Sequence, residues 1–167
     1  LEPLAFLGMA LYAVAMARRG GRQHPNRMAL FWSVGTGIMS CVGAGFLGFA
    51  HTLPQVNIWT HGTLVTAMHG HLAFWGAYGM LIFAMISYAL PEMTGRKLYG
   101  GWVPEWAFWA ANIGMVAMTG AFAVAGITQV YLERRVGMDF LDVQEAVSVH
   151  FFGLVLAASL FTIGIGL

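Results

Sequence analysis

Five long apolar stretches, separated by short polar segments, divide the chain. They cover roughly residues 1–16, 28–50, 62–90, 104–132 and 145–167. A helix needs about 20 largely apolar residues to span a bilayer, and lipid forces its backbone polar groups to pair internally. The pattern therefore predicts an all-α integral membrane fold, with five transmembrane helices in a single domain. Pro91 and Pro104 predict a turn between the third and fourth helices.

The amino-acid composition points the same way. The chain has 167 residues, of which 59% are hydrophobic and 9% charged, and its mean hydropathy is +0.71. A soluble domain carries about 25% charged residues, so an ordinary soluble protein is excluded. The formal net charge of +1, without any long basic run, excludes nucleic-acid binding. Cys41 is the only cysteine, so no disulfide forms within the chain, and we expect it to pack among small residues.

The basic residues indicate how the helices are oriented. Six of the eight lysines and arginines flank the loops after the first and third stretches: Arg18, Arg19, Arg22, Arg27, Arg96 and Lys97. The positive-inside rule places these loops in the cytoplasm. The segment 51–62 then faces the periplasm, and the chain is expected to be a multi-pass protein of the bacterial inner membrane.

The second apolar stretch is dense in glycine. Its glycines are Gly35, Gly37, Gly43, Gly45 and Gly48. Small residues let membrane helices approach each other closely, and this packing role is the simpler interpretation. The alternative is a helix face left without side chains for a flat cofactor.

Histidines interrupt the apolar sequence "HGTLVTAMHGHLAFWGAYG", which covers residues 61–79. Successive helical residues turn by about 100°, so His69 and His71 point about 200° apart and cannot easily share one metal ion. They could ligate two metal centres on opposite sides of the helix, and imidazole is a common axial ligand of haem iron. Hydrogen bonds to neighbouring helices are the alternative role. His51 and His61 fall at span ends, where we expect water around them.

An acidic residue, Glu2, lies within the first apolar stretch. At 1.5 Å per residue, His69 and His71 lie about 10–14 Å below the outer end of their helix. Glu2 lies about 24 Å above the cytoplasmic end of its own helix by the same rise. All three would share the outer half of the membrane, where Glu2 could carry protons to a metal centre. A hydrogen bond at a helix end, beside Pro3, is the alternative role for Glu2.

Three segments carry a family resemblance: "LEPLAFLGMALYA", "GAGFLGFAHTLPQVN" and "THGTLVTAMHGHLAFWGAYGMLIFAMISYALP". They closely resemble the large, catalytic subunit of cytochrome c-dependent nitric oxide reductases, within the haem-copper oxidase superfamily. The resemblance is close to about residue 90, looser to about residue 150 and weak beyond. Both chain ends fall in apolar runs, and the resemblance implies the last five helices of a twelve-helix bundle.

The resemblance also implies roles for individual residues. His69 corresponds to the axial ligand of the high-spin haem b3, and His71 to one of two axial ligands of the low-spin haem b. His61 corresponds to a contact of the haem propionates, and Thr52 would support that region. Glu2 corresponds to the catalytic acid on or beside the non-haem iron.

Other parts of the centre are expected outside this chain. The remaining iron ligands and the second haem b ligand match none of His24, His51 and His150. His150 is expected to make a polar contact near the outer surface. Arg134 and Arg135 loosely match arginines that neutralise propionates in related oxidases, but solvated interface charges are the simpler interpretation.

The resemblance further implies the reaction and the partners. Two NO, two electrons and two protons would give N2O and water in denitrification, a form of respiratory electron transport. The electrons would come from a membrane-anchored cytochrome c subunit, and the active site would lie in the periplasmic half of the membrane. Calcium at the haem propionates and the remaining helices of the same subunit would complete the assembly.

Three other functions stay open at the level of sequence. A terminal oxidase of the same superfamily, with copper in place of the second iron, shares the His-x-His pattern. A dihaem b membrane electron carrier without chemistry of its own would use the two histidines alone. A structural helical bundle would bind nothing. Glu2 and the wording "HGHLAFWGAYG" favour the reductase over the oxidase.

Overall fold

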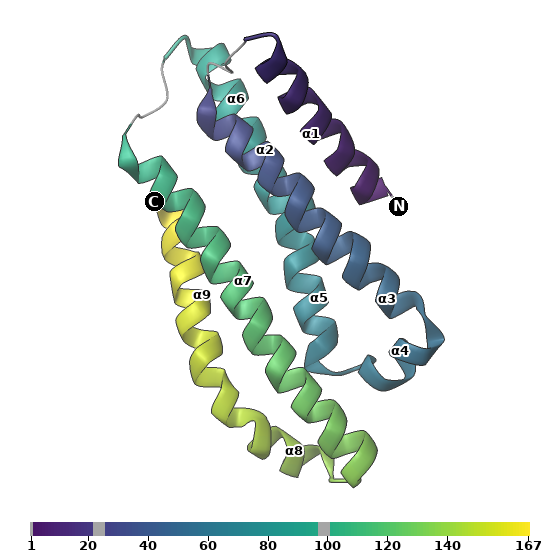
Figure 1. Ribbon diagram of the computed structural model, residues 1–167. Helices are drawn as coiled ribbons and strands as arrows, with labels where there is room; N and C mark the ends of the chain where they lie inside the picture. Colours follow the sequence, from purple (N-terminus) through teal and green to yellow (C-terminus); the bar gives the residue numbers. More distant parts are fainter. Residues whose placement is uncertain (1, 22–25, 97–100) are drawn as a thin grey trace.

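The structure, a computed structural model, describes residues 2–21, 26–96 and 101–167, and these are helical throughout apart from short turns (Figure 1). The α-helices are α1 (Glu2–Arg19), α2 (Arg27–Ser40), α3 (Gly48–Thr52), α4 (Pro54–Thr60), α5 (Leu64–Phe74), α6 (Met80–Thr94), α7 (Trp102–Tyr131), α8 (Phe140–Val147) and α9 (Phe151–Gly166). Wider π-helical turns form η1 (Cys41–Leu47), η2 (Trp75–Gly79) and η3 (Leu132–Val136), and η4 (Ser148–His150) is a single 3-10 turn.

Several of these elements run on without a break and make longer helices. In the described part of the chain, four are long and apolar enough to cross a membrane: Arg27–Thr52, Leu64–Thr94, Trp102–Val136 and Phe140–Gly166. The all-α, multi-pass membrane fold is therefore confirmed. The count of five spans is not, because α1 carries Glu2, Arg18 and Arg19 within its 18 residues and does not qualify.

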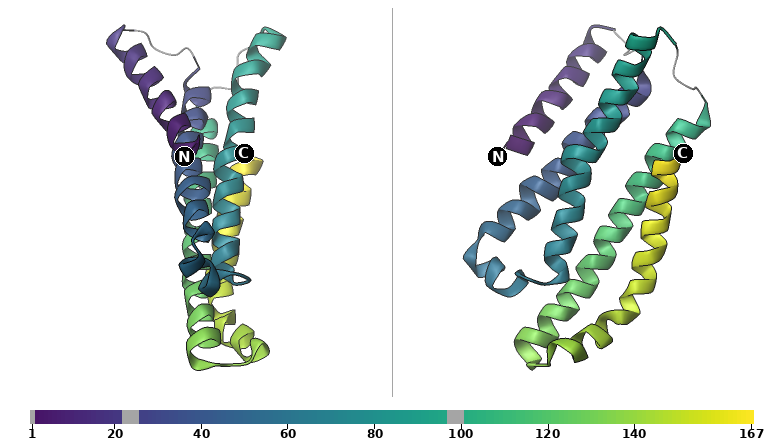
Figure 2. Two further views of the ribbon diagram at one scale, coloured as in Figure 1. Left: turned by 90° about the vertical axis from the view of Figure 1, so that its right-hand side faces the viewer. Right: turned by 180° about the vertical axis from the view of Figure 1, so that it is seen from behind.

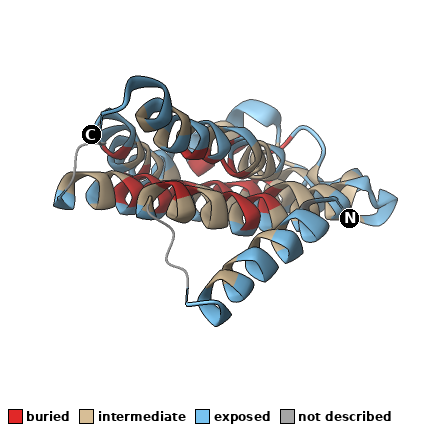
Figure 3. Cartoon of the chain, turned by 90° about the horizontal axis from the view of Figure 1, so that it is seen from above, coloured by how far each residue is buried: buried red, intermediate tan, exposed pale blue. Residues whose placement is uncertain are grey.

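The long helices pack in two groups around a shared centre (Figure 1). α2 lies along α5 and α6, while α9 runs antiparallel along α7. α7 also packs on α5 and so joins the two groups. α1 touches α2 and η1 near its start and diverges from the bundle toward its other end (Figure 2). Most of the buried residues lie in the central helices, and the described side chains of α1 are exposed or half-buried (Figure 3).

The charged residues separate the two ends of the bundle. Arg18, Arg19, Arg27 and Arg96 lie at one end, here called the basic end, where α1 and α6 finish and α2 begins (Figure 1). Arg22 and Lys97 lie outside the described residues. α3, α4 and α8 lie at the opposite end, here called the histidine end. At the basic end, Arg27 forms an ion pair of 2.9 Å with Glu105, which links the starts of α2 and α7.

An aromatic cluster joins the central helices. Trp32 of α2 stacks on Phe83 of α6 with ring centroids 4.8 Å apart. Trp32 also meets Phe108 of α7 edge to face at 4.9 Å. Trp75 is 5% exposed and donates its indole N–H to the Asn112 side chain at 3.2 Å. Buried aromatic rings contribute much of the packing energy of a core, and this indole is fully satisfied.

Glycines let α2–η1 and α5–η2 cross in close contact. A Cβ atom at Gly43 would lie 2.7 Å from the backbone nitrogen of Ala73. On the partner helix, a Cβ atom at Gly76 would overlap the backbone at Met39 and Ser40. The two helices therefore meet backbone to backbone at this point. The interpretation of the glycines as close-packing residues is supported here.

Pro91 lies inside α6 rather than in a turn, so the sequence-based prediction of its position was wrong. The helix continues to Thr94, and Gly95 ends it in the left-handed conformation with φ 63°. Proline has no N–H and leaves the carbonyl oxygen four residues earlier without its helical donor. That oxygen belongs to Ser87, and the Asn26 side-chain amide donates to it. Pro104 lies in the first turn of α7, where proline is tolerated.

The last long helix begins at Phe140, five residues before the predicted 145. Its first part, α8, is amphipathic, which a search for continuous apolar runs misses. Val143 and Val147 are fully buried at 0% exposure, while Asp142 and Glu145 are exposed. α8 therefore packs on the bundle at the histidine end before α9 turns back along α7.

Candidate functional site

His69 lies on α5, half-buried against η1. Its Nδ1 is 2.9 Å from the carbonyl oxygen of Gly43. A carbonyl can only accept, so Nδ1 carries the hydrogen and the neutral ring keeps Nε2 as a free lone pair. Metal-binding histidines show this pattern, because the second nitrogen is fixed by a donor bond to a backbone carbonyl or a carboxylate.

His71 lies two residues later and faces a different neighbour. Its ring is 4.9 Å from that of Phe122 on α7, tilted by 33°. Its Nδ1 is 2.8 Å from the carbonyl oxygen of Ala67, one turn earlier in the same helix. The side chain is exposed, and Nε2 is again the nitrogen left for a ligand. His69 and His71 therefore contact different helices, and each offers one ligand atom.

His51 is a residue of this site that the sequence analysis missed. Its ring stacks on that of His69, with centroids 5.0 Å apart and planes 22° from parallel. His51 Nδ1 is 2.9 Å from the carbonyl oxygen of Leu47. Its Nε2 is buried and has no hydrogen-bond partner. Among the described residues, it is the one buried side-chain nitrogen or oxygen without a partner. The expectation that His51 would be solvated was wrong, and no helical periodicity links residues on two different helices.

The two histidines are anchored on the same π-helical segment. Gly43 and Leu47 both belong to η1 and lie four residues apart. Wide π turns are frequent at functional sites, and one effect is to turn backbone carbonyls away from the regular helical hydrogen bonds. The carbonyls of Gly43 and Leu47 accept from the rings of His69 and His51, so both rings are held against the same segment.

Two features here fit a flat group bound at Nε2 of His69. A Cβ atom at Gly48 would lie 3.2 Å from Cε1 of His69, so the glycine gives the ring extra room. A buried nitrogen without a partner costs about 1–3 kcal/mol, and the Nε2 of His51 is such an atom. The residues present therefore fit a haem bound on the His69 side.

Glu2 lies apart from the histidines. Its exposed side chain lines a cavity of about 210 Å³ together with Phe6, Thr36, Ser40, Ala77 and Leu81. Ala77 follows His69 by eight residues, or about 12 Å along the helix. Glu2 and His69 are therefore separated along the bundle, while the expectation that both lie in the outer half of the membrane stays a prediction.

His61 and Thr52 lie at the histidine end, on either side of α4. Thr52 closes α3 and donates its hydroxyl to the carbonyl oxygen of Phe49 at 2.7 Å. His61 follows α4, and its backbone N–H bonds to Asn57. Both side chains are exposed at the surface of the bundle, which leaves them free to contact polar groups of a ligand.

The remaining candidates lie away from these residues. His150 is half-buried in η4, and Arg134 and Arg135 are exposed in η3 at the histidine end. His24 lies outside the described residues. Within residues 2–21, 26–96 and 101–167, no group of three or more His, Cys, Asp and Glu side chains could hold a metal ion.

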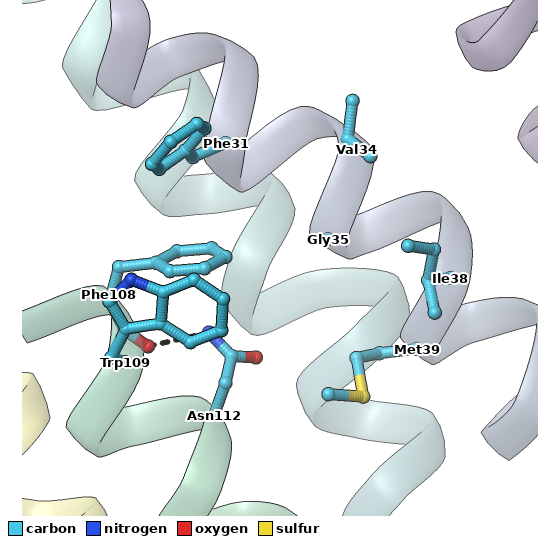
Figure 4. A pocket seen from close by; sticks show the side chains of 8 residues that line it. All are labelled: Phe31, Val34, Gly35, Ile38, Met39, Phe108, Trp109 and Asn112. Carbon is cyan, nitrogen blue, oxygen red and sulfur yellow. Dashed lines mark hydrogen bonds between the residues drawn. The ribbon is translucent and has the colours of Figure 1, made fainter. Parts of the chain in front are cut away.

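A second cavity, of about 290 Å³, opens between α2 and α7 (Figure 4). Its lining is almost wholly apolar: Phe31, Val34, Gly35, Ile38, Met39, Phe108, Trp109 and Asn112. The one amide there is occupied, because Asn112 donates to the Phe108 carbonyl at 2.7 Å and accepts from Trp75. The lining contains no acid, base or histidine, so this cavity offers no catalytic group.

Comparison with known proteins shows which protein family the sequence resembles. The family model described as Cytochrome C and Quinol oxidase polypeptide I matches residues 3–160. A nitric oxide reductase subunit from Stutzerimonas stutzeri is 40% identical over 177 aligned positions, which cover 99% of this chain and 36% of that protein. The chain thus spans about a third of that relative.

Two oxidase relatives match less of the chain. The cytochrome c oxidase subunit 1 homolog of Agrobacterium tumefaciens is 36% identical over 55% of this chain and 17% of its own length. Cytochrome c oxidase subunit 1 of Rhodobacter capsulatus is 33% identical over 59% of this chain and 20% of its own length. The similarity to the reductase subunit extends over more of the chain and is higher.

Proposed function

Because the chain belongs to the cytochrome c and quinol oxidase polypeptide I family, within the haem-copper oxidase superfamily, we propose that it forms part of the catalytic subunit of a nitric oxide reductase. The observation that carries the proposal is the pair of histidines on α5, each with Nδ1 bonded to a backbone carbonyl and Nε2 left for iron. The 40% identity to a nitric oxide reductase subunit over 99% of the chain favours the reductase within this family.

His69 and His71 would hold two different haems. His69 would bind the high-spin haem b3 on the η1 side, and His71 would be one axial ligand of the low-spin haem b on the α7 side. The carbonyls of Gly43 and Ala67 orient the two rings and leave Nε2 of each as the nitrogen that can bind a metal. When bound, the haems and a non-haem iron supply the redox chemistry, in which two NO, two electrons and two protons give N2O and water.

Glu2 would carry protons toward the non-haem iron. Its cavity also holds the hydroxyl residues Thr36 and Ser40, which can extend a hydrogen-bonded path. A positioned carboxyl group of this kind contributes to catalysis by proton transfer. At the histidine end, the exposed side chains of His61 and Thr52 would contact the haem propionates, with calcium nearby.

The rest of the enzyme would come from outside this chain. Further helices of a twelve-helix subunit would supply the second haem b ligand and the iron ligands. A membrane-anchored cytochrome c subunit would deliver electrons. The histidine end would face the periplasm, since Arg18, Arg19, Arg27 and Arg96 mark the other end as cytoplasmic. The complete enzyme would act in denitrifying respiration.

A terminal oxidase is the second candidate, because two of the relatives above are cytochrome c oxidase subunits or homologues. Both enzymes would use His69 and His71 in the same way. The two differ in substrate and in the second metal, copper or iron. Consumption of NO against consumption of O2 by the purified complex separates them.

The test uses the complete complex with single substitutions. We expect His71→Ala to remove the low-spin signal from the reduced-minus-oxidised spectrum, and His69→Ala to remove the high-spin haem that binds CO and NO. His150→Ala, on α9's side of the bundle, is the matched control and should keep both signals. Normal spectra in both of the first two variants would refute the ligand assignment. Reduction of O2 without reduction of NO would favour the oxidase.

A further inference from the structure

We propose that His51 is a positioning residue for His69: its stacked ring fixes the rotational angle of the imidazole that binds the high-spin haem. The inference rests on the proposed function, since it assumes a haem at His69. It concerns a residue for which the sequence offered no role.

His69 is held on one edge but needs support on its face. The hydrogen bond from Nδ1 to Gly43 fixes one point of the ring, and a ring held at one point can still pivot about that bond. On another edge of the ring, a Cβ atom built at Gly48 would lie 3.2 Å from Cε1 of His69. The close approach of Gly48 therefore limits movement of that edge. The face of the ring is covered by His51, at a centroid distance of 5.0 Å. Together these contacts restrict rotation of the His69 ring.

His51 is itself rigidly placed, as a positioning surface must be. Its Nδ1 is 2.9 Å from the Leu47 carbonyl. Its backbone carbonyl accepts from the Asn57 side chain at 2.8 Å, which ties it to α4. Ring and backbone are thus anchored separately. Stacked aromatic rings attract each other beyond the area they bury, so the contact holds His69 rather than merely filling space.

The orientation of an axial imidazole matters because the groups that contact a metal-binding histidine tune the metal it holds. His71 provides an internal reference, since it lies on the same helix but faces Phe122, away from His51. A change at His51 should therefore reach the haem on His69 and leave the haem on His71 unaltered. A general loss of folding would alter both.

The experiment compares His51→Ala with His51→Phe in the complete complex. The readout is the iron–histidine stretching band of the reduced high-spin haem, measured by resonance Raman spectroscopy, with the low-spin bands recorded in the same sample. We expect His51→Ala to shift and broaden the iron–histidine band while the low-spin bands stay in place. His51→Phe keeps an aromatic face without the nitrogens and should restore the wild-type band.

Each outcome is decisive. An unchanged band in His51→Ala overturns the proposal. A band in His51→Phe that is displaced as far as in His51→Ala also overturns it, because the nitrogens and not the face would then act. If His51→Ala loses both haems, His51→Phe decides alone: a wild-type band supports the proposal and a displaced one overturns it. A wild-type complex with no histidine-ligated high-spin haem would instead refute the proposed function.

Discussion

The Asn26 side-chain amide donates to the carbonyl oxygen of Ser87, the acceptor that Pro91 leaves without a helical donor. The same side chain accepts from the Ala29 N–H at 2.9 Å and so caps the start of α2. One residue at the basic end therefore satisfies two helices, one at its first turn and one at an interior proline. This contact ties α2 to α6 close to the aromatic cluster around Trp32.

We expect Asn26→Ala to lower the free energy of unfolding by about 1–3 kcal/mol, because it removes a helix cap and leaves a carbonyl unsatisfied. Thermal unfolding of the complex, followed by circular dichroism, measures the change. The second arm repeats the substitution in a Pro91→Ala background, where an N–H at position 91 can bond to Ser87. The loss should be smaller there. Equal losses in both backgrounds would mean that Asn26 does not compensate for the proline.

Gln129 satisfies the start of α5 from a neighbouring helix. It is 3% exposed, accepts from the Leu64 N–H at 2.9 Å and donates to Glu133. Replacement by leucine keeps much of the volume but leaves the Leu64 donor unpaired, so Gln129→Leu should destabilise the protein by about 1–3 kcal/mol. The Thr128 hydroxyl bonds only to Val124 within its own helix, and Thr128→Val is the control. Equal stability of the two variants in a denaturant titration would contradict the role of Gln129.

Gly43 marks the closest approach of η1 to α5. A methyl group there would meet backbone atoms of Leu72 and Ala73 at 2.7 Å, and a backbone cannot move aside as a flexible side chain can. Gly43→Ala should therefore destabilise the fold by about 1–3 kcal/mol through overpacking. Gly153→Ala on α9 has nothing within 4 Å and should be neutral or stabilising. The prediction fails if both variants unfold at the same temperature.

Gly48 contacts a side chain instead of a backbone. Gly48→Ala would press on Cε1 of His69 at 3.2 Å, and the imidazole ring can yield by a few tenths of an ångström. We expect a smaller loss of stability than for Gly43→Ala, together with a shift in the optical spectrum of the high-spin haem. The low-spin spectrum should not move. A shift in the low-spin spectrum alone would contradict this prediction, because His71 lies on a different side of α5 from the ring that Gly48 approaches.

Glu2→Gln keeps the shape of the side chain and removes its proton-carrying group. Since general acid–base groups contribute roughly 10²–10⁴-fold, NO turnover should fall by at least about 100-fold while both haem spectra persist. Glu92→Gln, at an exposed acid near the end of α6, is the matched control and should retain turnover. Full activity of Glu2→Gln would remove this residue from the proton path.

Hydropathy predicted the helical membrane fold because long apolar runs in lipid have few alternatives to the α-helix. It could not predict that α6 runs through Pro91, since the hydrogen bond that compensates comes from Asn26 on another helix. The fifth predicted span, at α1, is not confirmed. That stretch is apolar on average, yet Glu2, Arg18 and Arg19 lie within the helix itself.

The candidate site could be predicted only in part from the sequence, because some of its contacts join different helices. His69 and His71 lie on one helix, so their spacing in the sequence is enough to predict that they point in opposite directions. The contact of His51 with His69 joins two helices whose crossing is set by Gly43 and Gly76, and no local pattern encodes it. The position of Glu2 depends on how α1 packs along α2, where a Cβ atom at Gly37 would lie 3.1 Å from the Leu7 side chain.

The π-helical segment η1 also sets an angular offset along its helix. A π turn holds one residue more than an α turn, and one residue corresponds to about 100° of rotation. The side chains that follow Leu47, including His51, are rotated about the helix axis by this offset relative to Gly35 and Gly37, which precede η1. Two relatives that differ by one residue in this segment would present different side chains to the same haem. Insertions and deletions of a single residue here change the chemistry of the site, whereas the number and order of the helices would stay the same.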